Sequence, residues 1–152
     1  MFQQMKKRIK NEKGLTLIEL LAVIVILAIV AAIAVPAIGN IIDNSRAKAL
    51  KSDVINVMNA ANIYFTDSPK DKDGADIKSV EIQTLLDEKY LESKGKLNSA
   101  TVKYEVGGNT ITATGKSGSV SISVTNATLQ AINDGPDKPK DGVLTIGSEK
   151  KE

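Results

Sequence analysis

Leu15 to Ile38 read LTLIELLAVIVILAIVAAIAVPAI, and the chain is organised around this apolar stretch. A bilayer core about 30 Å thick is crossed by about 20 apolar residues in helical form, so the stretch is long enough to span a membrane. No charged residue occurs between Leu20 and Ile42. The sequence therefore predicts one apolar helix near the N-terminus that fits a bilayer or the centre of a fibre.

One acid, Glu19, lies inside the stretch and helps to separate three interpretations. The stretch is a plain membrane anchor, a secretory signal cut after Ala32-Ile33-Ala34, or a segment cut before the apolar residues, which then stay in the mature protein. A carboxylate within a span costs about 2.5–3.5 kcal/mol, so an intramembrane acid indicates a function and a partner. A plain anchor has no need of Glu19, and this favours the third interpretation.

The residues around Glu19 resemble the processing motif of type IV prepilins and pseudopilins. A short lysine-rich leader precedes the motif, which reads Gly14-Leu15-Thr16-Leu17-Ile18-Glu19-Leu20. In that family a membrane peptidase cuts after the glycine and methylates the new N-terminus. The resemblance implies cleavage between Gly14 and Leu15 and methylation of Leu15. Glu19 is then the fifth mature residue and Pro36 the twenty-second, and the family has a glutamate and often a proline at these positions.

Glu19 is expected to act in assembly. Cleavage creates an amino group at Leu15, about one helical turn from Glu19. In a staggered bundle of helices, Glu19 of one subunit meets the amine of its neighbour. Opposite charges attract strongly in a low-dielectric environment, and each alone is costly there. The pair would set the axial register of a fibre, as buried polar groups do in coiled coils.

Composition excludes several kinds of chemistry. The chain has no Cys, His or Trp, so disulfides, Cys or His metal sites and nucleophiles activated by histidine are excluded. We expect no enzyme activity and no cofactor. Many Gram-negative pilins resemble one another in closing a C-terminal loop with a disulfide. This chain lacks one and looks more like Gram-positive pilins.

The leader is strongly basic. It has five positive residues against Glu12, namely Lys6, Lys7, Arg8, Lys10 and Lys13. Positive residues beside a span stay in the cytoplasm, so the leader is expected inside the cell and the C-terminal domain outside. The rest of the chain has no strongly basic surface, and no specific nucleic-acid partner is expected.

The sequence predicts three parts: a cleaved leader at 1–14, an apolar helix at 15–38 and an extracytoplasmic domain at 39–152. One helix is expected to continue to residue 65, with a kink at Pro36 and Gly39. Its second half, 39–65, has an apolar stripe that should pack on the domain: Ala47, Leu50, Val54, Val57, Met58, Ala61, Tyr64 and Phe65. The charged residues between them, Lys51 and Asp53 included, are expected to face solvent.

Residues 66–95 are predicted to be a loop and a short helix. The loop has a weak likeness to a calcium loop at 71–74, where an Asp- and Gly-rich turn is the favoured interpretation. The helix is expected from Ser79, as its cap, to Leu91. Within residues 100–125, apolar and polar side chains alternate in three runs, the first of which extends to Val106, and glycine-rich turns separate the runs. This pattern predicts an antiparallel sheet. Residues 126–152 should be a C-terminal loop and tail, with 143–146 as a candidate edge strand.

The expected fold class is α+β: a long N-terminal helix packed against a small antiparallel sheet, as in pilins. The resemblance implies a major pilin, the structural subunit of a type IV pilus used in motility or adhesion. Its implied partners are further copies of itself, the prepilin peptidase, the membrane, an assembly ATPase and membrane platform proteins. It would sit in the cytoplasmic membrane before assembly and on the cell surface afterwards.

Two alternatives stay open. The first is that the chain is a minor pilin or pseudopilin of a type II secretion or DNA-uptake apparatus. The second, from another class of protein, is that it is a membrane-anchored binding domain.

Overall fold

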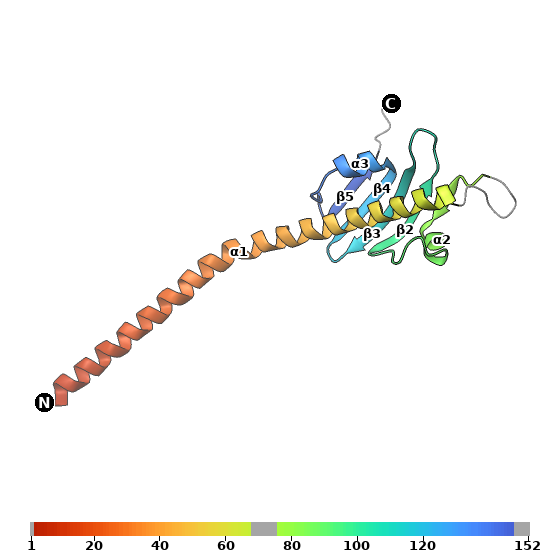
Figure 1. Cartoon of the computed structure of the whole chain (residues 1–152). Coiled ribbons are helices and arrows are strands. Elements are labelled where there is room, and N and C mark those ends of the chain that lie inside the picture. The colour runs from red at the N-terminus through yellow and green to blue at the C-terminus, as the bar shows by residue number, and fades with distance from the viewer. Residues whose placement is uncertain (1, 68–75, 148–152) are drawn as a thin grey trace, which may run out of the picture. The chain divides into compact units, whose positions relative to one another are not determined.

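The computed structural model describes residues 2–67 and 76–147, with side chains from residue 16 onward (Figure 1). The chain divides into two compact units, residues 1–41 and 42–152, and each is described by itself. The described elements are α1 (Phe2–Asp67), β1 (Ser79–Glu81), α2 (Ile82–Asp87), β2 (Leu97–Lys103), β3 (Thr110–Ser117), β4 (Val120–Thr128), α3 (Leu129–Asp134) and β5 (Val143–Gly147).

Helix α1 includes all of the apolar stretch. It begins at Phe2, so the leader segment also has helical backbone, and it ends two residues beyond the predicted end at Phe65. The helix continues through Pro36 and Gly39 without a break. Proline lacks an N–H, so the carbonyl of Ala32 has no partner one turn later. This local weakness is the basis of the predicted kink, which stays a prediction.

The sheet has the strand order β1-β2-β3-β4-β5 (Figure 1). The first four strands form the predicted antiparallel meander. The candidate strand at 143–146 is confirmed at the sheet edge, but it pairs parallel with β4, with Val124 opposite Ile146. Parallel neighbours need a crossover connection, which α3 and the residues after it supply. The fold is therefore α+β with a mostly antiparallel sheet.

The predicted helix from Ser79 to Leu91 is wrong at both ends, because the structure has a helix from Ile82 to Asp87 alone within this range. Ser79 to Glu81 form strand β1, in which buried Val80 lies opposite Val102. The helix that follows, α2, has six residues, and its N-cap is Glu81, without a capping side-chain hydrogen bond. Pairing with β2 gives the backbone of Ser79–Glu81 partners that an isolated helical turn would lack, and this decides the outcome.

Strand β2 ends earlier than predicted. Its last residue is Lys103, and Val106, expected in the strand, is 99% exposed. The side chain of Asn109 accepts a hydrogen bond from the backbone N–H of Glu105 at 3.0 Å, which closes the turn into β3. Gly108 has a positive φ of 127° there, a conformation that glycine adopts without strain. The chain therefore leaves the sheet before the apolar pattern ends.

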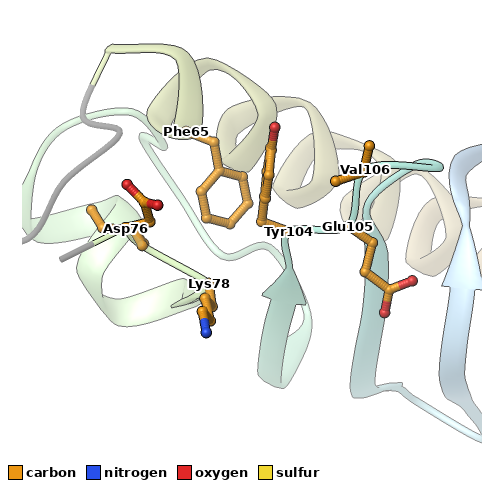
Figure 2. Close-up of a pocket in the computed structure, with 7 residues that line it drawn as sticks. Phe65, Asp76, Lys78, Tyr104, Glu105 and Val106 are labelled. Carbon is orange, nitrogen blue, oxygen red and sulfur yellow. The ribbon is translucent and has the colours of Figure 1, made fainter.

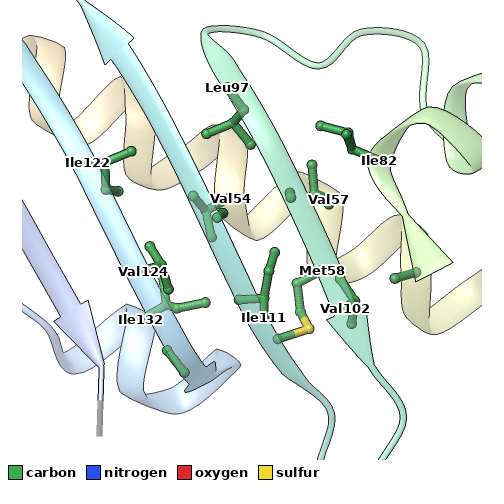
Figure 3. Close-up of a cluster of buried hydrophobic side chains, with 14 of the residues drawn as sticks. Val54, Val57, Met58, Ile82, Leu97, Val102, Ile111, Ile122, Val124 and Ile132 are labelled. Atoms are coloured by element: carbon green, nitrogen blue, oxygen red, sulfur yellow. The ribbon is translucent and has the colours of Figure 1, made fainter. Parts of the chain in front are cut away.

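The predicted apolar stripe of α1 is confirmed. All eight of its residues are buried, and they form one cluster with the inward side chains of the sheet (Figure 3). Val54, Val57 and Met58 of α1 lie over residues such as Ile111 and Val124 of the strands. One face of the sheet is thus covered by residues 42–67 of α1, as an antiparallel sheet with one buried face requires.

Lys51 of α1 is buried rather than solvated. It is 7% exposed, and its Nζ donates to the carbonyls of Asn133 at 3.1 Å and Gly135 at 2.9 Å and to Oδ1 of Asp137 at 2.8 Å. The hydrogen bond from Lys51, together with its positive charge, holds the pKa of Asp137 below the ordinary value of 3.8. Lys51 therefore ties the connection between α3 and β5 to the long helix.

Other polar side chains on the borders of the stripe tie further connections to α1. Each of them hydrogen-bonds a different turn of the sheet, and the pairs are Arg46 with Ser119 at 3.0 Å, Asp53 with the N–H of Lys96 at 2.9 Å, and Asn62 with Asn109 at 2.8 Å. Asp53 was expected to face solvent, and it is half-buried instead. The loops of the domain are therefore held by the helix that the domain covers.

Candidate functional site

The apolar stretch has almost no cover within the chain. Its large side chains from Leu17 to Ile42 are between 43% and 72% exposed. By length and composition, the part of α1 from Thr16 onward is able to cross a membrane, and it is the one such helix among the described residues. Monomeric soluble proteins rarely show contiguous apolar patches above a few hundred Å². This surface needs lipid or other protein around it.

The predicted site residues all lie on α1. Gly14 and Leu15 are helical in their backbone, and Glu19 follows Leu15 by four residues, a spacing that puts both on one face of a helix. Glu19 is exposed among apolar neighbours. A Cβ built on Gly39 meets nothing within 4 Å, so its helix surface is open. The structure thus arranges the predicted residues along one helix, and among those whose side chains it describes, the surfaces of Glu19 and Gly39 are open.

Residues 9–35 match the family model of the prokaryotic N-terminal methylation motif. This motif marks type IV pilin-like prepilins. The N-terminal segment of this chain is that of a type IV pilin-like prepilin. The match includes Gly14, Leu15 and Glu19 and stops one residue before Pro36. The remainder of this pilin-like chain adds a long helix packed on a small sheet, an α+β architecture of the same kind. Comparison with curated proteins and with solved structures gave no match.

A pocket of about 600 Å³ lies where α1 ends (Figure 2). The rings of Phe65 and Tyr104 meet edge to face with centroids 5.5 Å apart. Lys78 and Glu105 line the pocket, but their charged ends point away from the rings. Small-molecule sites combine apolar walls with a few convergent polar groups. The pocket lacks this convergence and is the open side of an aromatic cluster, so we assign it no ligand.

The part of the chain that the structure describes contains no group of three or more Asp or Glu side chains arranged to hold a metal ion. The weak calcium-loop pattern at 71–74 lies outside the described residues. The pilin-like family is a structural one. The candidate site that the structure offers is the exposed apolar surface of α1 from Leu17 to Ile42, with Glu19 as the one acid there.

Proposed function

We propose that this pilin-like protein is the major structural subunit of a type IV pilus. The observation that carries the proposal is the exposed apolar surface of α1, which begins at the methylation motif and includes one charged residue, Glu19. A head domain with its own core lies C-terminal to this surface. A subunit with both parts is suited to polymerise through the helix and to present the domain outside.

Processing is proposed between Gly14 and Leu15, with methylation of the new amino group on Leu15. The cut removes the basic leader, which keeps the N-terminus on the cytoplasmic side until then. The same cut produces the positive charge that Glu19 needs as a partner. An uncut subunit has no amine at this position, so its helix lacks the contact that would fix its register in a filament.

Assembly transfers α1 from lipid to a bundle of similar helices. Lipid tails are as apolar as leucine, so the transfer yields little hydrophobic energy, and close packing and polar pairs must hold the helices together. Small residues such as Ala28, Ala32 and Gly39 allow close approach, and Glu19 supplies the polar pair. The prepilin peptidase, an assembly ATPase and membrane platform proteins are the proposed partners, and the cell-surface pilus is the proposed final location.

The mature N-terminus tests processing. Mass spectrometry of membrane and surface fractions should find a methylated Leu15. A start at Val35 would mean an ordinary signal peptide and would refute the proposal. An intact Met1 in cells that make other pili would indicate a membrane-anchored domain.

Filament yield tests the role of Glu19. Glu19→Ala subunits should be cut normally but should be nearly absent from sheared surface filaments, because they lack the pair. Glu19→Asp, which keeps the charge, is the matched control and should retain part of the yield. Normal yield with Glu19→Ala would refute the register role. Sheared wild-type filaments in which this chain is scarce would identify a minor pilin or pseudopilin instead.

A further inference from the structure

The face of the sheet turned away from α1 is covered by hydroxyl groups. Along strands β2 to β5 the inward side chains are buried under α1, and the side chains that alternate with them are mainly serine and threonine. We call these residues the hydroxyl face: Ser99, Thr101, Thr112, Thr114, Ser121, Ser123, Thr125 and Thr145. None of them is buried.

This face is depleted of charge. A quarter of the whole chain is charged, yet strands β2 to β5 contain two charged residues, Lys103 and Lys116. Lys103 lies opposite Thr110 at one end of the sheet, and Lys116 lies opposite Ser121 at the other. At the β1 edge, Glu81 lies opposite Thr101, and Lys94 lines the same surface hollow as Ser99 and Thr101. The neutral band is therefore the central part of the face, formed by Thr112, Thr114, Ser123, Thr125 and Thr145. A surface that served solubility alone would be expected to share the charge of the rest of the chain.

The hydroxyl groups follow the register of the sheet. Ser99 pairs with Thr114, Thr114 with Ser123, and Ser123 with Thr145, so one row of hydroxyls crosses four strands. Neighbouring strands lie about 4.8 Å apart, and residues on one face repeat about every 6.8 Å along a strand. Within the row, the oxygens of Ser99 and Thr114 are 2.9 Å apart. The result is a regular grid of polar groups.

The chemistry of the grid selects its partner. A hydroxyl both donates and accepts hydrogen bonds, which suits a surface of other hydroxyls. Protein interfaces are enriched in aromatic residues, Met and Arg and depleted in Ser, so this face is unlike a protein-binding one. A polyanion would need a basic surface, and the central band has no charge. We propose that the hydroxyl face binds a neutral polysaccharide whose repeating hydroxyls match the grid.

This proposal goes beyond the pilus subunit and does not depend on it. The full chain in detergent micelles presents the sheet whether or not it forms filaments, so failure of filament assembly leaves the binding assay intact. The probes are microcrystalline cellulose, chitin and dextran beads as neutral polysaccharides, with heparin beads as the anionic comparison. Binding is measured by depletion of the protein from solution.

The decisive variant is Thr114→Val/Thr145→Val. Valine keeps the shape and strand preference of threonine but removes the hydroxyl, so the fold should persist. Each lost hydrogen bond should weaken binding about fivefold, and the double variant roughly 25-fold, because the two sites are separated by β4. Thr114→Ser/Thr145→Ser keeps both hydroxyls and should bind like the wild type. Ser52→Ala removes a hydroxyl from the exposed side of α1, outside the hydroxyl face, and is a control that should bind like the wild type.

Binding of the wild type to at least one neutral probe, lost in the valine variant and kept in the serine variant, would establish the proposal. No binding to any neutral probe would overturn it. Equal binding by the valine and wild-type proteins would also overturn it, as would binding to heparin beads alone. Self-association that disappears in the valine variant, measured by light scattering, would show a contact between copies of the chain and reject the polysaccharide.

Discussion

Replacing Lys51 by methionine should loosen the C-terminal part of the domain without unfolding the rest. Methionine keeps most of the apolar length of the lysine side chain, so the packing of α1 changes little. It removes the ammonium that donates to the carbonyls of Asn133 and Gly135 and to Asp137. These groups belong to the connection that carries the chain from α3 back to the edge strand β5.

The size of the effect follows from opposing terms. Hydrogen bonds from a charged group contribute about 1.5–3 kcal/mol each, and Lys51 makes two to backbone carbonyls. Against them stands the desolvation of a buried ammonium, which costs several kcal/mol and disappears in the variant. Asp137 is exposed and is solvated again in the variant, so its share of the loss is small beside that of the two carbonyls. We expect a net loss of about 2 kcal/mol, which corresponds to an equilibrium constant for local opening that is about 30-fold larger.

Hydrogen exchange of the full chain in detergent micelles measures this opening by segment. Backbone amides of α3 and β5 should exchange about 30-fold faster in Lys51→Met, while those of β2 and β3 change far less. Lys48→Met removes a nearby exposed lysine and is the matched control, which should leave the pattern unchanged. Equal exchange of β5 in Lys51→Met and the wild type would refute the view that Lys51 holds this connection.

Three further predictions follow from the same domain. Because the hydrogen bond and charge of Lys51 lower the pKa of Asp137, the small stabilisation by this pair is present above the unfolded pKa of about 3.9 and is lost as the pH falls through the lower folded value. The protection of the β5 amides, after correction for the intrinsic pH dependence of exchange, should therefore fall below about pH 4 in the wild type, with a weaker pH dependence in Asp137→Asn. Gly95→Ala should lower the free energy of unfolding of the domain by about 1–3 kcal/mol in urea, because Gly95 has a φ of 60° and an added Cβ would collide with the carboxylate of Asp53. Gly39→Ala is the control and should leave the stability of the domain unchanged, because an added Cβ there meets nothing within 4 Å. Leu50→Ala should cost about 2–5 kcal/mol in the same assay, because fully buried Leu50 leaves a cavity in the core, and an unchanged midpoint would contradict this packing.

The sequence predicts best where one local rule decides the structure. The stripe of α1 follows the helical period, and all of its residues are buried as predicted. The residues around Glu19 are adjacent in sequence, so their motif needs no tertiary information. Strand β5 shows the limit, since its parallel pairing depends on where α3 returns the chain, which period-two alternation does not determine.

Lys51 shows a second limit. It follows Ala47 by four residues and precedes Val54 by three, so helical spacing places it on the buried stripe itself. Its charge favoured an exposed interpretation, because lysines are almost never fully buried unless paired. Its partners are two backbone carbonyls and Asp137, more than 80 residues away in sequence. Helical spacing therefore indicated that Lys51 is buried, but the hydrogen-bond partners that make its burial tolerable are brought together only by the fold.

The two parts of α1 use apolar surface in different ways, and this bears on where assembly takes place. From residue 42 onward, the apolar stripe is already buried against the sheet, and the polar residues on its borders hold the loops. Little of that surface remains for another subunit without dismantling the domain. The residues from Leu17 to Ile42 have no comparable cover in the described structure. We therefore expect association through apolar helix contacts to be confined to the segment that begins at the methylation motif, where Glu19, the proposed register residue, is the one charged group between residues 16 and 42.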